Sequence, residues 1–310
     1  MKTLLVGYRS GDLFEKGKHG RRHTAGWLDG DVTCHTLDIY DRHAIEKTHH
    51  LKAVCSPHLP EGPWDLVKFR TGPKLMSGEL ALDLLQEIHL MKPARFELDY
   101  VGRERDRNDL LAKIKDDPER VRDFSARWKA SVPGIEPIEL VSFPGCFCHR
   151  RRDEGGLALA EVVAREIAGK GELSILDMGC GCGLVGFLVA AKAGAKKLVM
   201  VDSHSRAVEA ARLNSERLGI PAEVILADGG TPARMDGSFD IFVGNPPYYS
   251  DYRIADVFLE TAKRALKPGG ASYTVCKNAA GLEPVERRYF PDVEIVKRRG
   301  YAVLKSVKEA

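Results

Sequence analysis

One stretch, ILDMGCGCGLVG (175–186), restricts the fold of this chain more than any other part of its sequence. An apolar run ends in Asp177, glycines follow as Gly179, Gly181 and Gly183, and an apolar helical pattern then begins. Glycine lets the backbone turn tightly and approach a ligand, and the N-terminus of the helix faces that ligand. The stretch therefore predicts a strand–loop–helix unit with a binding site at the end of the strand.

Acidic residues at the ends of successive strands indicate the kind of ligand. The Asp-x-Gly-x-Gly-x-Gly spacing differs from the loop of dinucleotide-binding folds, and the Asp177 carboxylate suits a cationic ligand better than a pyrophosphate. Asp202 closes the next apolar run, where an acid accepts hydrogen bonds from ribose hydroxyls. Asp228 follows a third run and can accept from an adenine amino group. A helix cap at Asp202 and a simple turn at Asp228 remain open alternatives.

The rest of the second half predicts a doubly wound α/β fold with a mostly parallel sheet, because apolar, β-branched runs alternate with helical patterns. We expect strands at 173–178, 197–202, 222–228, 239–244 and 271–276, and helices at 157–168, 183–193, 205–217 and 253–266.

The first half repeats part of this pattern without the glycine loop. Residues 64–93 match 239–268 without a gap, so that Asp65 falls on Asp240 and Pro93 on Pro268. This predicts two similar α/β domains, a degenerate one over 1–140 and a catalytic one over 141–310. In the first we expect strands at 3–8, 33–40, 64–69 and 95–101, helices at 77–91 and 106–117, and a linker at 130–145 that ends in a strand.

The composition of the chain limits its possible partners, its compartment and its metal content. The formal net charge of +3 and the pI of about 8.4 permit a nucleic-acid partner without requiring one. No run approaches the ~18 apolar residues of a membrane span, and seven cysteines, an odd number, suggest reduced thiols. We expect a cytoplasmic protein with no membrane partner. The Cys-x-Cys spacings at 146–148 and 180–182 differ from the usual zinc pattern, so no metal is expected.

A rigid turn, Asn245-Pro246-Pro247-Tyr248, follows the expected strand at 239–244. The two prolines remove backbone donors and fix two φ angles. The side-chain carbonyl of Asn245 and the backbone carbonyl of Pro246 can both accept from a planar amine, and the Tyr248 ring can stack on a flipped base. The turn therefore suggests a site that holds an amine conjugated to a ring.

These motifs together resemble class I S-adenosylmethionine-dependent methyltransferases. Over 141–310 they are similar to the ribosomal RNA guanine-N2 methyltransferases, the RsmC/RlmG group. The segment FPGCFCHRRRDEGGLAL (143–159) resembles the family pattern Pro-Gly-x-Phe-Ser followed by Asp-x-Gly-Ser. Pro144, Gly145, Phe147, Asp153 and Gly155 match this pattern, and Cys148 stands in place of the usual serine.

The resemblance implies an enzyme that transfers a methyl group from S-adenosylmethionine to guanine N2 in ribosomal RNA, with a first domain that binds no cofactor. The residues implied for the cofactor are Asp177, Gly179, Gly181, Gly183, Asp202, Asp228 and Asn245, and those implied for catalysis are Asn245, Pro246, Pro247 and Tyr248.

Two alternatives stay open. The same turn serves enzymes that methylate adenine N6 or a protein glutamine, although the glutamine enzymes usually carry a helical first domain and residues 1–140 suggest α/β. A non-catalytic RNA-binding assembly factor on this fold is the other, and the intact glycine loop and Asn245 argue against it.

Overall fold

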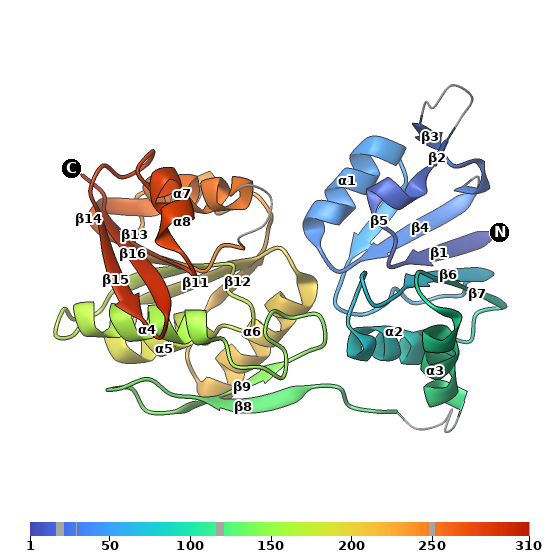
Figure 1. Ribbon diagram of the computed structural model, residues 1–310, viewed down its shortest axis with the longest axis horizontal. Helices are drawn as coiled ribbons and strands as arrows, with labels where there is room; N and C mark the ends of the chain where they lie inside the picture. Colours follow the sequence, from blue (N-terminus) through green and yellow to red (C-terminus); the bar gives the residue numbers. More distant parts are fainter. Residues whose placement is uncertain (17–21, 29, 116–120, 248–251, 310) are drawn as a thin grey trace. The chain divides into compact units, whose positions relative to one another are not determined.

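The computed structural model describes residues 1–310 except 17–21, 29, 116–120, 248–251 and 310. The chain forms two compact units (Figure 1). Unit 1 comprises Met1–Ser125, Phe143–Gly145 and His204–Arg206, and unit 2 comprises Ala126–Ser142, Cys146–Ser203 and Ala207–Ala310. Residues 126–140, which the sequence analysis assigned to the first domain, thus group with unit 2.

Unit 2 contains a seven-stranded sheet in the order β12-β11-β10-β13-β14-β16-β15. The strands run parallel except β16, which is antiparallel to both of its neighbours. The strands are β10 (Ser174–Met178), β11 (Lys197–Asp202), β12 (Glu223–Leu226), β13 (Phe239–Gly244), β14 (Leu266–Cys276), β15 (Val293–Arg298) and β16 (Tyr301–Val307). The helices are α4 (Glu154–Glu166), α5 (Leu184–Ala193), α6 (Ser205–Leu218, whose first two residues group with unit 1), α7 (Arg253–Ala265) and α8 (Ala279–Glu286).

Helices cover both faces of this sheet, as its alternating side chains require. Leu176 of β10 and Phe242 of β13 pack in one buried cluster with Phe258 and Leu259 of α7. Asp177, the next residue along β10, points to the opposite face and contacts α5. The predicted strands and helices of 157–276 are confirmed, except that β14 begins at Leu266 and includes the Lys-Pro-Gly-Gly segment.

Unit 1 contains a parallel five-stranded sheet in the order β5-β4-β1-β6-β7. Its strands are β1 (Lys2–Val6), β4 (Asp31–Thr36), β5 (Lys52–Cys55), β6 (Leu66–Thr71) and β7 (Arg95–Tyr100), with a small hairpin of β2 (Phe14–Lys16) and β3 (Arg22–Thr24). Its helices are α1 (Ile39–His49), α2 (Gly78–Met91) and α3 (Glu104–Lys115). This order equals that of β12-β11-β10-β13-β14, and β6, α2 and β7 take the places of β13, α7 and β14. The predicted fold class, two tandem Rossmann-like domains, is confirmed.

One expectation for the first half was wrong. The strand predicted at 33–40 ends at Thr36, because the Asp38 side chain accepts a hydrogen bond from Tyr40 N (2.8 Å) and caps helix α1. The linker predicted at 130–145 does end in a strand, β9 (Ile138–Ser142), which pairs antiparallel with β8 (Ala126–Ala130), a strand that the sequence analysis did not predict.

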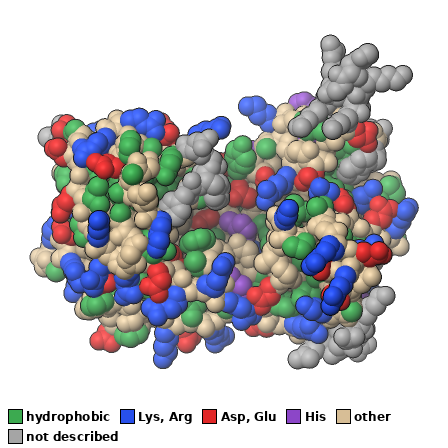
Figure 2. Space-filling view, viewed as in Figure 1, with side chains coloured by type: hydrophobic (Ala, Val, Ile, Leu, Met, Phe, Trp, Pro, Cys, Tyr) green, Lys and Arg blue, Asp and Glu red, His purple; other side chains and the backbone are tan. Residues whose placement is uncertain are grey.

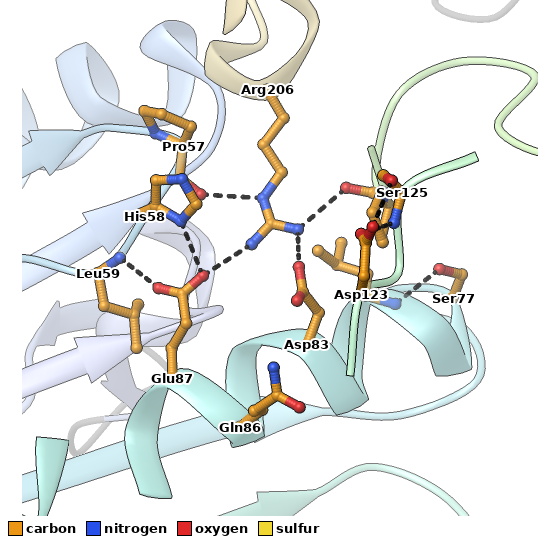
Figure 3. Close-up of polar contacts among 12 residues, drawn as sticks. Pro57, His58, Leu59, Ser77, Asp83, Gln86, Glu87, Asp123, Ser125 and Arg206 are labelled. Carbon is orange, nitrogen blue, oxygen red and sulfur yellow. Dashed lines mark hydrogen bonds and ion pairs between the residues drawn. The ribbon is translucent and has the colours of Figure 1, made fainter. Parts of the chain in front are cut away.

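Charged side chains of both signs are interspersed on the face drawn in Figure 2, with no single large basic patch. Unit 1 also contains a buried ion cluster (Figure 3). Arg206, only 2% exposed, donates to Pro57 O (2.9 Å) and pairs with the carboxylates of Asp83 and Glu87. Within the described residues, no helix is long and apolar enough to cross a membrane.

Candidate functional site

The candidate site lies at the carboxyl end of β10, where the strand order of unit 2 reverses. The chain leaves β10 toward β11 on one side, and β13 pairs with β10 on the other. Met178 is in register with Gly244, so the glycine loop and Asn245 leave the same edge of the sheet from adjacent strands. In open α/β sheets this reversal point is where ligands bind.

The glycine loop uses three left-handed backbone conformations. Gly179, Gly181 and Gly183 have φ angles of +70°, +55° and +92°. A Cβ atom at Gly179 would press on Phe258 and one at Gly183 would overlap Phe187, whereas one at Gly181 would meet nothing within 4 Å. The outer glycines are therefore required by packing, and Gly181 keeps an open side toward which a ligand can approach.

Asp202, the last residue of β11, is held by this loop. Its Oδ2 accepts a hydrogen bond from Gly181 N (2.8 Å), and the side chain remains partly exposed. Asp228 lies two residues beyond the end of β12 and is also partly exposed. Because β10, β11 and β12 are adjacent and parallel, these acids follow the same sheet edge. The open glycine and the acids after the two next strands fit a ligand with ribose hydroxyls and a cationic centre.

Asp177 is only 2% exposed and supports the loop from the interior. Its Oδ2 accepts a hydrogen bond from Gly186 N (2.8 Å) in the first turn of α5. Burial raises the pKa of Asp177 to about 7, with smaller contributions from the neighbouring Asp202 and Asp153 carboxylates and an opposing one from the hydrogen bond of Gly186 N. Asp177 thus fixes the position of α5, and its contact with the cofactor stays a prediction.

The Asn-Pro-Pro turn contacts a carboxylate that is distant in the sequence. Asn245 Nδ2 donates to Asp153 Oδ2 (3.4 Å). Pro246 is buried and Pro247 is half-buried, so the turn is anchored as well as stiff. Tyr248, predicted as the stacking residue, lies outside the described residues.

Asp153 is itself fixed as the N-cap of α4. Its Oδ1 accepts from Gly156 N (2.8 Å), and burial raises the pKa of its carboxyl group. A carboxylate only accepts hydrogen bonds, so it selects the amide end Nδ2 of Asn245. The carbonyl end of Asn245 is thereby directed away from the Asp153 carboxylate. The sequence analysis matched Asp153 to a family pattern but gave it no role, since the contact spans 92 residues.

A second residue that the sequence analysis missed is Asn214 of α6, which is fully buried. Its Nδ2 donates to Val141 O (2.8 Å) and to Cys182 O (2.9 Å), and its Oδ1 accepts from Val141 N (2.8 Å). Asn214 therefore ties the glycine loop to β9. An Asn within an amphipathic helix pattern gave no signal of this role.

The cysteines of the loop are buried thiols. Burial raises the pKa of Cys182 to about 12 and that of Cys180 well above its ordinary value. Both sulfurs are therefore protonated thiols at neutral pH. Among the residues that the structure describes, no group of three or more His, Cys, Asp or Glu side chains is placed to hold a metal ion.

Known proteins share this sequence pattern and fold. The family described as "Methyltransferase small domain" matches residues 137–305. Ribosomal RNA small subunit methyltransferase C of Haemophilus influenzae is 29% identical over 178 residues, which are 56% of this chain and 52% of that protein. The protein of the same name from Pseudomonas paraeruginosa is 33% identical over 173 residues, covering 54% and 50%. This chain thus spans about half the length of the curated relatives it matches.

A solved structure matches over the full chain. It is described as the T. thermophilus 16S rRNA N2 G1207 methyltransferase (RsmC) in complex with AdoMet and guanosine. The TM-score is 0.79, with 18% sequence identity, and the match covers 100% of this chain and 88% of the other. At this identity the likeness concerns the fold, including the presence of two α/β units.

Proposed function

Since this chain belongs to the methyltransferase small domain family, we propose that it transfers a methyl group from S-adenosylmethionine to the exocyclic N2 of a guanine in ribosomal RNA. The relatives named as ribosomal RNA small subunit methyltransferases support this substrate, as does the neighbour whose complex contains AdoMet and guanosine. The reaction would take place in the cytoplasm, on ribosomal RNA or a ribosomal subunit.

The residues around the glycine loop would hold the cofactor, which supplies an electrophilic methyl group on a sulfonium. Gly181 would leave room for the methionine portion, because no atom lies within 4 Å of the place where its Cβ would be. Asp202 would accept from the ribose hydroxyls and Asp228 from the adenine amino group. The acids at this edge also favour a cationic ligand.

Asn245 and Pro246 would hold the target nitrogen. An exocyclic amine conjugated to a purine is a poor nucleophile, so its position and its developing positive charge both matter. The Asn245 carbonyl and the Pro246 backbone carbonyl would accept its two N–H groups, which aligns the nitrogen and stabilises the charge as it forms. No general base is needed beforehand, because the proton can leave after transfer.

The contact between Asn245 Nδ2 and Asp153 Oδ2 carries this assignment, because it fixes which end of the amide faces Asp153 and directs the carbonyl end away from it. Substituting Asn245→Ala should reduce methyl transfer to ribosomal RNA at least about a hundredfold while leaving S-adenosylmethionine binding nearly unchanged. Calorimetry with the cofactor and radiolabelled methyl transfer measure the two effects. Asn108→Ala, on the exposed surface of α3, is the matched control and should retain full activity. Retained activity in Asn245→Ala would contradict the mechanism.

The nucleobase is tested separately. Nucleoside mass spectrometry of ribosomal RNA from a deletion strain should show the loss of one N2-methylguanosine. Loss of N6-methyladenosine instead, or labelling of a glutamine in a ribosomal protein, would assign the same site to another planar amine.

A further inference from the structure

The segment Cys146–Arg152 of unit 2 presents an exposed aromatic ring and three arginines beside the candidate site. The geometry points to a grip for single-stranded RNA, in which Phe147 stacks on a nucleobase that flanks the target guanine and Arg150 and Arg151 contact the adjoining phosphates. This inference rests on the proposed function and adds to it the element that holds the RNA chain.

Phe147 is 68% exposed, although it lies between buried or half-buried residues. Burying a phenyl ring stabilises a fold by about 1.5–3 kcal/mol, so an exposed ring on an ordered turn forgoes that stabilisation. The next residue, Cys148, has a φ of +55°, a conformation that costs a non-glycine residue about 1–2 kcal/mol. Exposure and backbone strain together are typical of a contact surface.

The segment holds this shape through its own hydrogen bonds. His149 N donates to Cys146 O (3.2 Å) and Arg151 N donates to Cys148 O (2.9 Å), which forms two successive turns. The His149 ring also hydrogen-bonds through Nδ1 to Ser142 Oγ (3.0 Å) at the end of β9. Phe147 is thus presented by a built turn and not by a loose loop.

The charge of the segment complements phosphate. Arg150, Arg151 and Arg152 are all exposed, and the segment contains no acidic residue. Arg152 also pairs with Glu154 (3.2 Å) just beyond the segment, and elsewhere in unit 2 Arg298 and Arg299 pair with the buried Glu161. Three consecutive exposed arginines therefore place positive charge next to the Phe147 ring in the sequence.

Chain connectivity places this grip near the reacting atoms. Asp153, the residue that follows the segment, contacts Asn245 and lies six positions after Phe147. Six residues span at most about 20 Å, the length of a few nucleotides of single-stranded RNA. An aromatic ring stacks on any base, and a flipped guanine leaves its neighbours unstacked and available.

The test measures RNA binding and methyl transfer with full-length protein and ribosomal RNA from a deletion strain, together with a fluorescent single-stranded oligoribonucleotide for anisotropy. Phe147→Leu should weaken binding to both RNAs and raise the KM for ribosomal RNA about tenfold, with kcat within about twofold, since stacking contributes ~1–3 kcal/mol per base. Phe147→Trp should restore binding. Tyr40→Leu, at a ring of matched exposure (67%) in α1 of unit 1, should change neither.

The phosphate contacts proposed for Arg150 and Arg151 are tested by the salt dependence of RNA affinity. Arg150→Ala with Arg151→Ala should reduce the slope of log affinity against log salt by about 1 to 1.5. Arg287→Ala is the control, because that guanidinium already pairs with Glu283. Unchanged RNA affinity in Phe147→Leu would overturn the inference. If the parent binds RNA but does not methylate it, the proposed function fails, and the binding series still decides whether this segment is the grip.

Discussion

Asn245 Nδ2 donates to Asp153 Oδ2 across 3.4 Å, which joins the turn after β13 to the N-cap of α4. An amide group presents a donor end and an acceptor end that are nearly equal in shape, so the turn alone does not fix which end faces a ligand. The Asp153 carboxylate, held by Gly156 N, accepts only and so fixes the amide in one orientation. Asp153 is therefore a positioning residue for Asn245 in the proposed reaction.

Replacing Asp153→Asn tests this orientation. The new amide can donate as well as accept, so the Asn245 side chain is free to turn its own Nδ2 toward the target amine. We expect kcat to fall about ten- to hundredfold, while the dissociation constant of S-adenosylmethionine changes less than about twofold. Single-turnover methyl transfer and calorimetry measure the two quantities. Equal kcat values in parent and variant would show that Asp153 serves only as a helix cap.

Gly156→Ala tests the same contact from the helix side. A Cβ atom at position 156 would overlap Asp153 Oδ2, the oxygen that accepts from Asn245. Alanine otherwise favours a helix over glycine by about 0.5–1 kcal/mol. We expect methyl transfer to fall about tenfold, with the midpoint of thermal unfolding little changed.

The matched control is Gly78→Ala at the start of α2, where an added Cβ atom meets nothing within 4 Å. This variant should keep full activity and gain slightly in thermal stability. If Gly156→Ala were as active as Gly78→Ala, the position of Asp153 Oδ2 would not matter for the reaction.

Part of the site could be predicted from the sequence because it consists of local patterns. The glycine loop and the Asn-Pro-Pro turn each follow an apolar strand directly, so the parallel sheet brings them to one edge. The contacts of Asp153 and Asn214 could not be predicted, because their partners lie 92 and 73 residues away and neither side chain breaks a local rule. The position of Asp177 at the end of a strand could be predicted from its pattern, but its burial and its bond to Gly186 N could not.

The fold followed from the sequence where apolar runs were long and buried on both faces, as in β10, β11 and β13. The prediction of the fold failed where the bounds of a short element depended on one side chain or on a partner strand. Asp38 ends one predicted strand by capping α1. The strand β8, with alternating charged residues, is defined by its pairing with β9.

Asp177 should make the stability of unit 2 depend on pH. Its pKa is raised from an ordinary value of 3.8 to about 7, so the native state retains this proton more tightly than the unfolded state. The associated stability is complete below about pH 4 and is lost as the pH rises through about 7. A shift of this size corresponds to up to about 4 kcal/mol in the free energy of unfolding.

The measurement compares the parent with Asp177→Asn, which is neutral and can still accept from Gly186 N. Urea unfolding at pH 4 and pH 8 should show that the parent loses stability relative to the variant over this interval. Parallel pH profiles for the two proteins would mean that Asp177 remains ionised in the folded state.

The Asn214 side chain should contribute to stability through the backbone groups that it satisfies. Asn214→Ala would leave Val141 N, Val141 O and Cys182 O without this partner in a fully buried position. Each buried group that loses its hydrogen bond costs about 1–3 kcal/mol, so we expect a loss of at least about 3 kcal/mol. S-adenosylmethionine affinity should also fall, since Cys182 belongs to the glycine loop. A loss of less than about 1 kcal/mol in urea unfolding would refute this role.

The ion cluster of Arg206, Asp83 and Glu87 predicts that removing the Arg206 charge lowers the free energy of unfolding of the protein. Arg206→Met removes the cation that Asp83 and Glu87 share and leaves Pro57 O without its donor. Breaking a buried pair from one side destabilises a protein by about 3–5 kcal/mol, and the partial exposure of both carboxylates places this case near the lower figure. Hydrogen exchange of the α2 amides should accelerate accordingly.

Adding Asp83→Asn and Glu87→Gln to Arg206→Met removes the unpaired charges and should recover much of the lost stability. If the triple variant were no more stable than Arg206→Met, packing of the Arg206 side chain, and not its charge, would be what stabilises the cluster.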